Sequence, residues 1–83
     1  MTIESIKDFV ESQVHKDIPV NIHFKQRESI KGLFIRSVDY EELKSKNLWR
    51  IVQSPKIEEW MRTSNMDLPR IFNGISFTKL TDE

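Results

Sequence analysis

The sequence predicts a mostly β fold of the α+β class. We expect an N-terminal helix, then a strongly bent five-stranded antiparallel small barrel with a short helix inserted between its third and fourth strands. Three observations predict this. Apolar residues first recur at helical spacing and then alternate with polar ones. Gly32 interrupts a strand pattern, and Asn73-Gly74 separates the last two apolar runs. At 83 residues, the chain has room for one domain, residues 1–83.

The first expected element is an amphipathic helix over residues 2–14. Its apolar stripe consists of Ile3, Ile6, Phe9, Val10 and Val14. Thr2 or Ser5 is suited to cap the free backbone amides. The helix has to end before Pro19, because the residue before a proline avoids the helical region.

Two strands follow and form a hairpin. Residues 20–25 alternate apolar and polar side chains, and residues 30–36 form the second strand after a polar turn. Gly32, inside the second strand, indicates a bulge, a sharp bend or a close approach of two backbones. The charged residues 39–46 fit either a loop or a short helical turn.

Residues 47–52, rich in aromatic and β-branched side chains, are the expected third strand. Ser54-Pro55 predicts a helix that runs to about residue 62, with Ser54 as the N-cap. Residues 70–72 and 75–80 are the last two strands, and Asn73-Gly74 between them predicts a tight turn.

Composition excludes several classes of protein. The net charge is zero, with 13 basic and 13 acidic side chains, whereas a nucleic-acid module held by bulk charge would be far more basic. The absence of cysteine excludes disulfides and thiolate metal sites. Two glycines cannot build a glycine-rich phosphate loop, so a dehydrogenase is excluded and no cofactor is expected. No signal peptide or membrane span is visible, so we expect a cytoplasmic protein that does not enter a membrane.

The chain resembles the Sm/LSm family of small β-barrels, which is related in architecture to SH3-like barrels. The first Sm motif is matched loosely by the alternating strand 20–24, by residues 30–34 around Gly32, and by Asp39. The second motif is matched loosely by residues 71–77, where Asn73 stands in place of the basic residue that the family has before its glycine.

The resemblance implies an RNA site built from two loops. One loop would contribute Asp39, Tyr40 and Asn47, with Tyr40 stacking on a base, and the other Asn73 and Gly74. It also implies rings in which the last two strands of neighbouring copies pair. The structural alternative for Asn73-Gly74 is turn geometry alone, because both residues tolerate positive φ.

A basic hairpin is the second candidate contact for single-stranded RNA. Between residues 20 and 38, four basic residues stand against one acidic residue, and Lys25, Arg27 and Lys31 lie on or beside the turn. Two alternatives remain open. The hairpin is an ordinary solvated surface, or it is attracted to the acidic first helix within the molecule or across a dimer.

The remaining candidates are apolar or titratable. Trp49 is expected in the core, whereas Trp60, with Met61 and Met66, is either core or a patch for an unknown protein partner. His15 and His23 have no metal or catalytic spacing.

These observations leave three functional hypotheses. We predict a non-enzymatic binding module for RNA, self-association, or both. The alternative is a protein-interaction or structural domain without a nucleic-acid role. A hydrolase using His23 is the least supported hypothesis, and it requires a carboxylate beside that ring.

Overall fold

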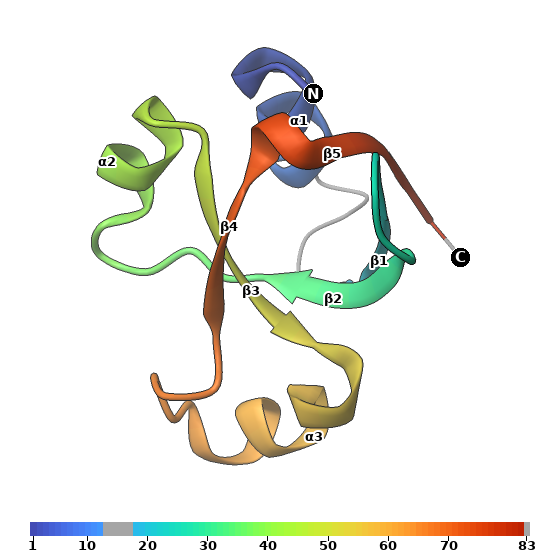
Figure 1. Ribbon diagram of the computed structural model, residues 1–83. Coiled ribbons are helices and arrows are strands. Elements are labelled where there is room, and N and C mark those ends of the chain that lie inside the picture. The colour runs from blue at the N-terminus through green and yellow to red at the C-terminus, as the bar shows by residue number, and fades with distance from the viewer. Residues whose placement is uncertain (13–17, 83) are drawn as a thin grey trace.

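The structure is a computed structural model that describes residues 1–12 and 18–82. The elements, in chain order, are α1 (Ile3–Val10), β1 (Val20–Phe24), β2 (Ile30–Phe34), α2 (Tyr40–Ser45), β3 (Leu48–Gln53), α3 (Ser54–Thr63), β4 (Arg70–Asn73), the 3-10 turn η2 (Gly74–Ser76) and β5 (Phe77–Thr81). The strands form one five-stranded antiparallel sheet in the order β4-β3-β2-β1-β5 (Figure 1). The α+β class, the leading helix and the inserted helix are therefore confirmed.

The sheet curves strongly enough to bring β1 close to the outer strand β4. Phe24 on β1 and Phe72 on β4 have ring centroids 6.1 Å apart, although β2 and β3 lie between their strands. A β-carbon on Gly32 would lie 2.5 Å from Ile51 Cγ2 and 3.2 Å from the Val52 carbonyl oxygen, so this position has no room for a side chain. Of the three possibilities predicted for Gly32, the bulge is wrong, since its pairings with Val20 and Gln53 stay in register and the register irregularity lies between His23 and Phe24.

Pairing does not close the sheet into a full barrel. Strands β4 and β5 are the two outer strands, and they are joined by η2 without pairing with each other. The prediction of a tight turn at Asn73-Gly74 is wrong. Neither residue has positive φ, and the strands before and after this pair, β4 and β5, form no hairpin. Asn73 instead caps η2, its side-chain oxygen accepting from the Ile75 amide at 2.9 Å.

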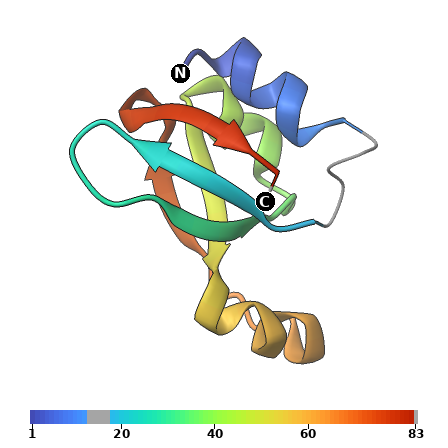
Figure 2. The same cartoon turned by 90° about the vertical axis from the view of Figure 1, so that its right-hand side faces the viewer.

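Two apolar clusters lie on opposite faces of the sheet, because successive strand residues point to opposite sides. Ile51 belongs to the larger cluster, on the concave face, which Ile6 and Val10 of α1 complete. Val52 belongs to the smaller cluster, on the other face, against which Trp60 of α3 packs. Figures 1 and 2 show α1 and α3 at opposite ends of the molecule, so the two helices are not layered on one side of a flat sheet.

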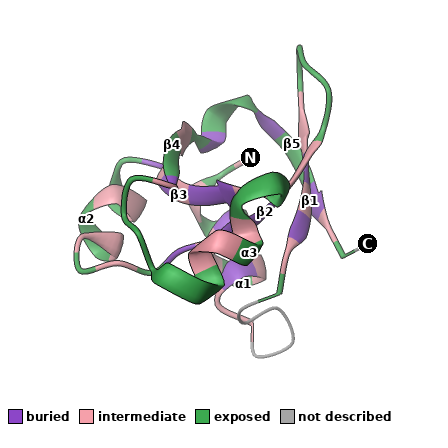
Figure 3. Cartoon of the chain, turned by 90° about the horizontal axis from the view of Figure 1, so that it is seen from below, coloured by how far each residue is buried: buried purple, intermediate pink, exposed green. Residues whose placement is uncertain are grey.

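The elements differ in how far their side chains are buried. The largest fully buried side chains come from β3 (Trp49, Ile51, Val52) and from α1, β1 and β5 (Ile6, Ile22, Phe77), whereas much of α3 is exposed (Figure 3). The expectation that Trp49 belongs to the core is confirmed, since 1% of it is exposed. Within the described ranges, no helix combines the length and the apolar character needed to cross a bilayer.

Element boundaries differ from the sequence prediction at several places. Helix α1 begins after its predicted cap Thr2, whose hydroxyl accepts from the Ser5 amide, but it ends at Val10 instead of residue 14. Val14 and His15 lie outside the described residues. The charged stretch 39–46 contains the short helix α2, which was one of the two alternatives.

The start of α3 also differs. Gln53 is its N-cap and Ser54 already lies in the first turn, so the prediction of Ser54 as the cap is wrong by one residue. The pairing of Gln53 with Gly32 explains the shift, because the strand runs on to the helix without an intervening loop. Strand β2 ends at Phe34, two residues earlier than expected.

Candidate nucleic-acid interface

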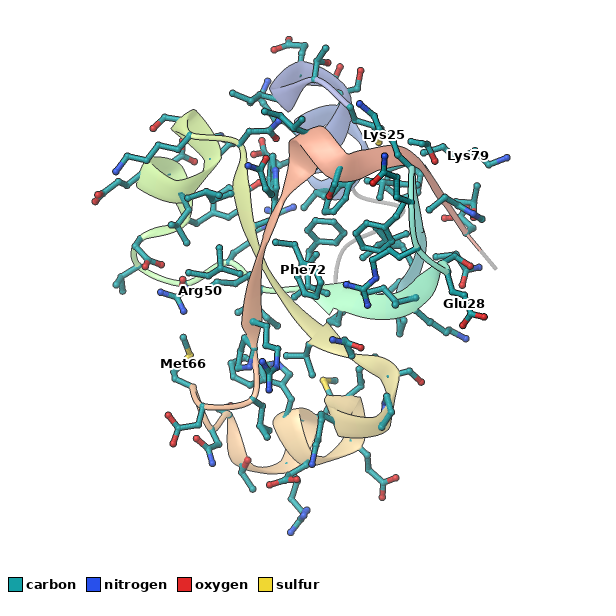
Figure 4. All side chains as sticks on the ribbon, viewed as in Figure 1. Lys25, Glu28, Arg50, Met66, Phe72 and Lys79 are labelled. Carbon is teal, nitrogen blue, oxygen red and sulfur yellow. The ribbon has the colours of Figure 1, made fainter. Side chains whose placement is uncertain are left out.

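An open groove of about 910 Å³ lies between the β1–β2 hairpin and the outer strand β4. Register explains why Arg70 and Phe72 line its concave side, whereas Arg50 and Ile71 line it from the other face. Arg70 and Phe72 stand opposite Ile51 and Trp49 of β3, so both point to the concave face of the sheet. Arg27 reaches the groove from the hairpin, and Gln53 and Asn73 add amide groups. Figure 4 shows Phe72 and Arg50 on opposite sides of β4.

The groove carries two arginines, Arg27 and Arg70, that are not paired with a described acidic side chain. In the part of the chain that the structure describes, neither Arg27 nor Arg70 forms an ion pair. Both are exposed residues. A guanidinium in this state can donate several hydrogen bonds to a phosphate oxygen. The two positive charges therefore face any ligand that enters from solvent.

Arg50 also lines the groove, but its charge is compensated. Its Nη2 lies 2.7 Å from Asp39 Oδ2, and its Nε donates to Asp39 Oδ1 at 3.3 Å. These bonds, with another from the Ser37 hydroxyl, lower the pKa of Asp39 from 3.8 to about 2. Asp39 thus fixes Arg50 beside α2 and remains ionised at neutral pH.

Aromatic rings form the floor of the groove and of the hollow next to it. Phe24 contacts Phe72 with centroids 6.1 Å apart and meets Phe77 edge-on at 5.3 Å. The guanidinium carbon of Arg27 lies 4.8 Å from the centroid of the Phe24 ring. Phe24 and Phe72 are half-buried, so part of each ring stays accessible. Cations and partly exposed rings side by side are the groups that hold the phosphates and bases of a single strand.

The hairpin residues predicted for RNA binding are distributed over two faces. Lys25 is exposed and lines a smaller hollow beside Phe24 and Arg27. Lys31 pairs with Asn21 and directly precedes Gly32 in β2. A side chain at Gly32 would face Ile51, on the concave side. Lys31 therefore points to the convex face, away from the groove.

Tyr40 lies outside the groove and is already engaged. Its hydroxyl donates to Glu11 Oε2 at 2.7 Å, and its ring meets Trp49 edge-on at 6.1 Å. Lys44 Nζ and Arg36 Cζ lie 5.1 and 5.8 Å from its ring centroid. Burial, and then the bond to Glu11, raise the pKa of Tyr40. Tyr40 thus connects α2 to α1.

Asn47 and Gly74 meet, as the resemblance implied, but inside the molecule. Only 8% of Asn47 is exposed, and its Oδ1 accepts from Trp49 Nε1 at 2.8 Å. The Gly74 amide donates to the Asn47 carbonyl at 2.8 Å. A β-carbon on Gly74 would overlap Asn47 Oδ1 and lie 2.5 Å from Ile6 Cδ1. Asn47 has a φ of 61°, so the left-handed residue of this region is Asn47 and not Gly74.

The remaining candidates lie elsewhere. Trp60 is half-buried on the smaller cluster, whereas Met61 is 65% and Met66 47% exposed. His23 Nε2 lies 3.3 Å from Thr81 Oγ1, and His15 falls outside the described residues. Among residues 1–12 and 18–82, no group of three or more histidines and carboxylates is placed to hold a metal ion.

Sequence reasoning missed Arg50, Gln53, Arg70 and Phe72. Arg70 and Phe72 are two positions apart on one short strand, so the sequence shows that they share a face. Only the register with β3 shows that this face is the concave one. Comparison of the chain with protein-family models, with curated proteins and with solved structures found no match.

Proposed function

We propose that this protein is a non-enzymatic binding module that holds single-stranded RNA in the groove between the β1–β2 hairpin and β4. The observation that carries the proposal is the pair of uncompensated arginines, Arg27 and Arg70, beside the accessible ring of Phe72. Phosphates would bind the guanidinium groups, and a base would stack on the ring. A duplex would present its bases to each other instead, so the ring favours a single strand.

Local charge supports this proposal although the net charge is zero. Arg27 and Arg70 line the groove and Lys25 lines the adjacent hollow with Arg27, whereas Asp39 is paired with Arg50. Asn73 and Gln53 add side-chain amides that can hydrogen-bond base edges. Of the site that the resemblance implied, this groove keeps Asn73 and excludes Tyr40, Asn47 and Gly74, whereas Arg27 comes from the basic hairpin, the second candidate contact.

Strand order and curvature support the finer fold assignment, a small barrel of Sm-like or SH3-like type. The first strand lies between the second and the last, and the sheet brings Phe24 on β1 to Phe72 on β4. Both features are expected when a five-stranded sheet rolls up around one core. The gap between β4 and β5 is the difference from a closed barrel.

Self-association through the last two strands is the second candidate. Strands β4 and β5 are the two outer strands of the sheet, and an outer strand leaves one row of backbone donors and acceptors for another chain. Pairing β4 of one copy with β5 of the next would join copies head to tail and close a ring. Sedimentation velocity over a range of concentrations tests this, since a monomer at every concentration would contradict it.

A fluorescence anisotropy titration with labelled single-stranded RNA tests the main proposal. Wild type would be compared with the variant Arg27→Glu/Arg70→Glu at two salt concentrations. We expect affinity to fall with salt and the charge reversals to remove most of it. The slope of log affinity against log salt should decrease by about 0.7 for each phosphate that the variant no longer neutralises.

The matched control is Arg62→Glu, the same change on exposed α3, outside the groove. It should bind RNA as wild type does. Equal, negligible binding by all three proteins at low salt would contradict RNA binding and favour the protein-interaction alternative.

A further inference from the structure

A separate apolar cavity of about 280 Å³ lies along the end of β2, between α1 and α3. Phe9 and Val10 contribute to it from α1, and Trp60 and Met61 from α3. All of its lining side chains except Arg36 are apolar, and it shares no residue with the arginine groove. Its volume is just below the range of roughly 300–1,000 Å³ that is usual for ligand pockets, so one apolar side chain suits it better than a large molecule.

Arg36 supplies a positive charge at this cavity. Its Nη2 donates to the Val10 carbonyl at 2.8 Å, and its Cζ lies 5.8 Å from the Tyr40 ring centroid. Both partners are neutral, and Arg36 forms no ion pair within the ranges that the structure describes. The guanidinium is thus held in place while its charge remains available to a carboxylate.

Among residues 1–12 and 18–82, no strand pairs with the end of β2 on its β1 side, beside the cavity. Strand β1 begins at Val20, because Pro19 before it has no amide hydrogen to donate. Its pairing with β2 therefore stops at Gly32. The Ile35 amide donates to the Arg50 carbonyl on the β3 side. Since antiparallel residues alternate, Phe34 directs its backbone donor and acceptor to the side that β1 leaves open.

We propose that this cavity binds the carboxyl terminus of a partner polypeptide whose last residue is a large aliphatic one. The final side chain would fill the apolar cavity, the terminal carboxylate would pair with Arg36, and the preceding backbone would hydrogen-bond to Phe34. Each of the three features recognises a different part of the same chain end. This site is independent of the RNA groove and gives Trp60 and Met61 a shared role.

A fluorescein-labelled glycine–serine peptide ending in leucine is the probe, titrated into the full chain by anisotropy. Two matched peptides end in leucinamide and in glycine. We expect the free acid to bind about tenfold more tightly than the amide, because the amide cannot form the charged hydrogen bond. The glycine peptide should bind at least as weakly as the amide, because it leaves the cavity empty.

The protein variants locate the contact. Arg36→Gln should lower the affinity for the free-acid peptide to that for the amide peptide and leave the affinity for the amide unchanged. Arg36→Lys should retain part of the preference for the free acid. Arg62→Gln on exposed α3 is the matched control and should change nothing. Circular dichroism checks that each variant is folded.

Several outcomes would overturn the proposal. Equal binding of acid and amide would remove Arg36 from recognition, and no binding of the acid at millimolar protein would remove the site. If N-acetylleucine competes as tightly as the whole peptide, the preceding backbone contributes nothing, and the cavity is a site for free acids and not for a polypeptide end. None of these results depends on whether RNA binds the groove.

Discussion

Phe24 and Phe72 lie with ring centroids 6.1 Å apart, although two strands separate them in the sheet. In a flat sheet, three strand spacings would place them roughly 14 Å apart. Their contact therefore requires the sheet to curve onto itself. Phe72 lines the groove and Phe24 lines the hollow beside it, so curvature and the candidate RNA site depend on the same pair of side chains.

A double-mutant cycle on this pair tests the curvature. With Phe24→Leu, Phe72→Leu and the double variant, urea unfolding should give a coupling energy of about 0.5–1.5 kcal/mol, the range for aromatic pairs. Strictly additive losses of stability would contradict the contact. Ile57→Val combined with Phe72→Leu is a control pair that should be additive, since Ile57 packs against the smaller cluster on the other face of the sheet.

Gly74→Ala should destabilise the protein by about 1–3 kcal/mol, because the new methyl group overlaps Asn47 Oδ1 and crowds Ile6. Ser76→Ala, in the same 3-10 turn but exposed, should cost less than about 1 kcal/mol. Chemical denaturation measures both. Equal effects would contradict the crowding at Gly74, because its φ is not positive and turn geometry does not require glycine there.

Asn47→Ala should be more destabilising than Asn47→Gly. Both variants lose the bond to Trp49 Nε1, but only alanine is strained at a φ of 61°, by about 1 kcal/mol. The two midpoints in urea give the comparison. The folded variant Asn47→Gly should also bind RNA as wild type does, because Asn47 is buried away from the groove. A large drop in its affinity for RNA would show that Asn47 belongs to the binding site.

Acid should weaken the protein partly through Asp39. Arg50 and Ser37 hold the pKa of Asp39 at about 2 in the folded state, below its ordinary value of 3.8. A carboxyl with a lowered pKa contributes stability above its unfolded pKa and loses that contribution as the pH falls toward the folded value. Stability should therefore decrease between about pH 4 and pH 2.

The variant Asp39→Asn isolates this contribution. It should show a shallower decrease in that pH range than wild type, measured by urea unfolding at a series of pH values. Asp67→Asn, at an exposed carboxylate in the loop before β4, is the control and should follow wild type. An unchanged acid profile for Asp39→Asn would show that the ion pair with Arg50 contributes no stability.

Local patterns were sufficient to predict most elements. The alternation from Val20 to Phe24 and the Ser54-Pro55 signal each predicted an element that the structure contains. The hairpin turn predicted at Asn73-Gly74 was wrong, because this pair also suits the start of a 3-10 turn. Which of the two forms depends on Asn47 and Ile6, which pack against Gly74 from distant parts of the chain.

The groove was only partly predictable for a similar reason. Arg27 was recognised from its place in a basic hairpin, which is a local property. Arg70 and Phe72 join it only because β4 pairs with β3 in one register and the sheet then bends toward the hairpin. Tyr40 was expected to face a ligand, but it is engaged by Glu11, a contact across 29 positions that no local pattern contains.

The most direct test of the RNA groove is amide chemical-shift mapping by NMR while a single-stranded RNA hexamer is added to isotope-labelled protein. The proposal predicts progressive shifts at Arg27, Arg70, Phe72 and Asn73, which lie in the hairpin and on β4. Shifts confined to α3 or α2, or no shifts at millimolar RNA, would contradict it.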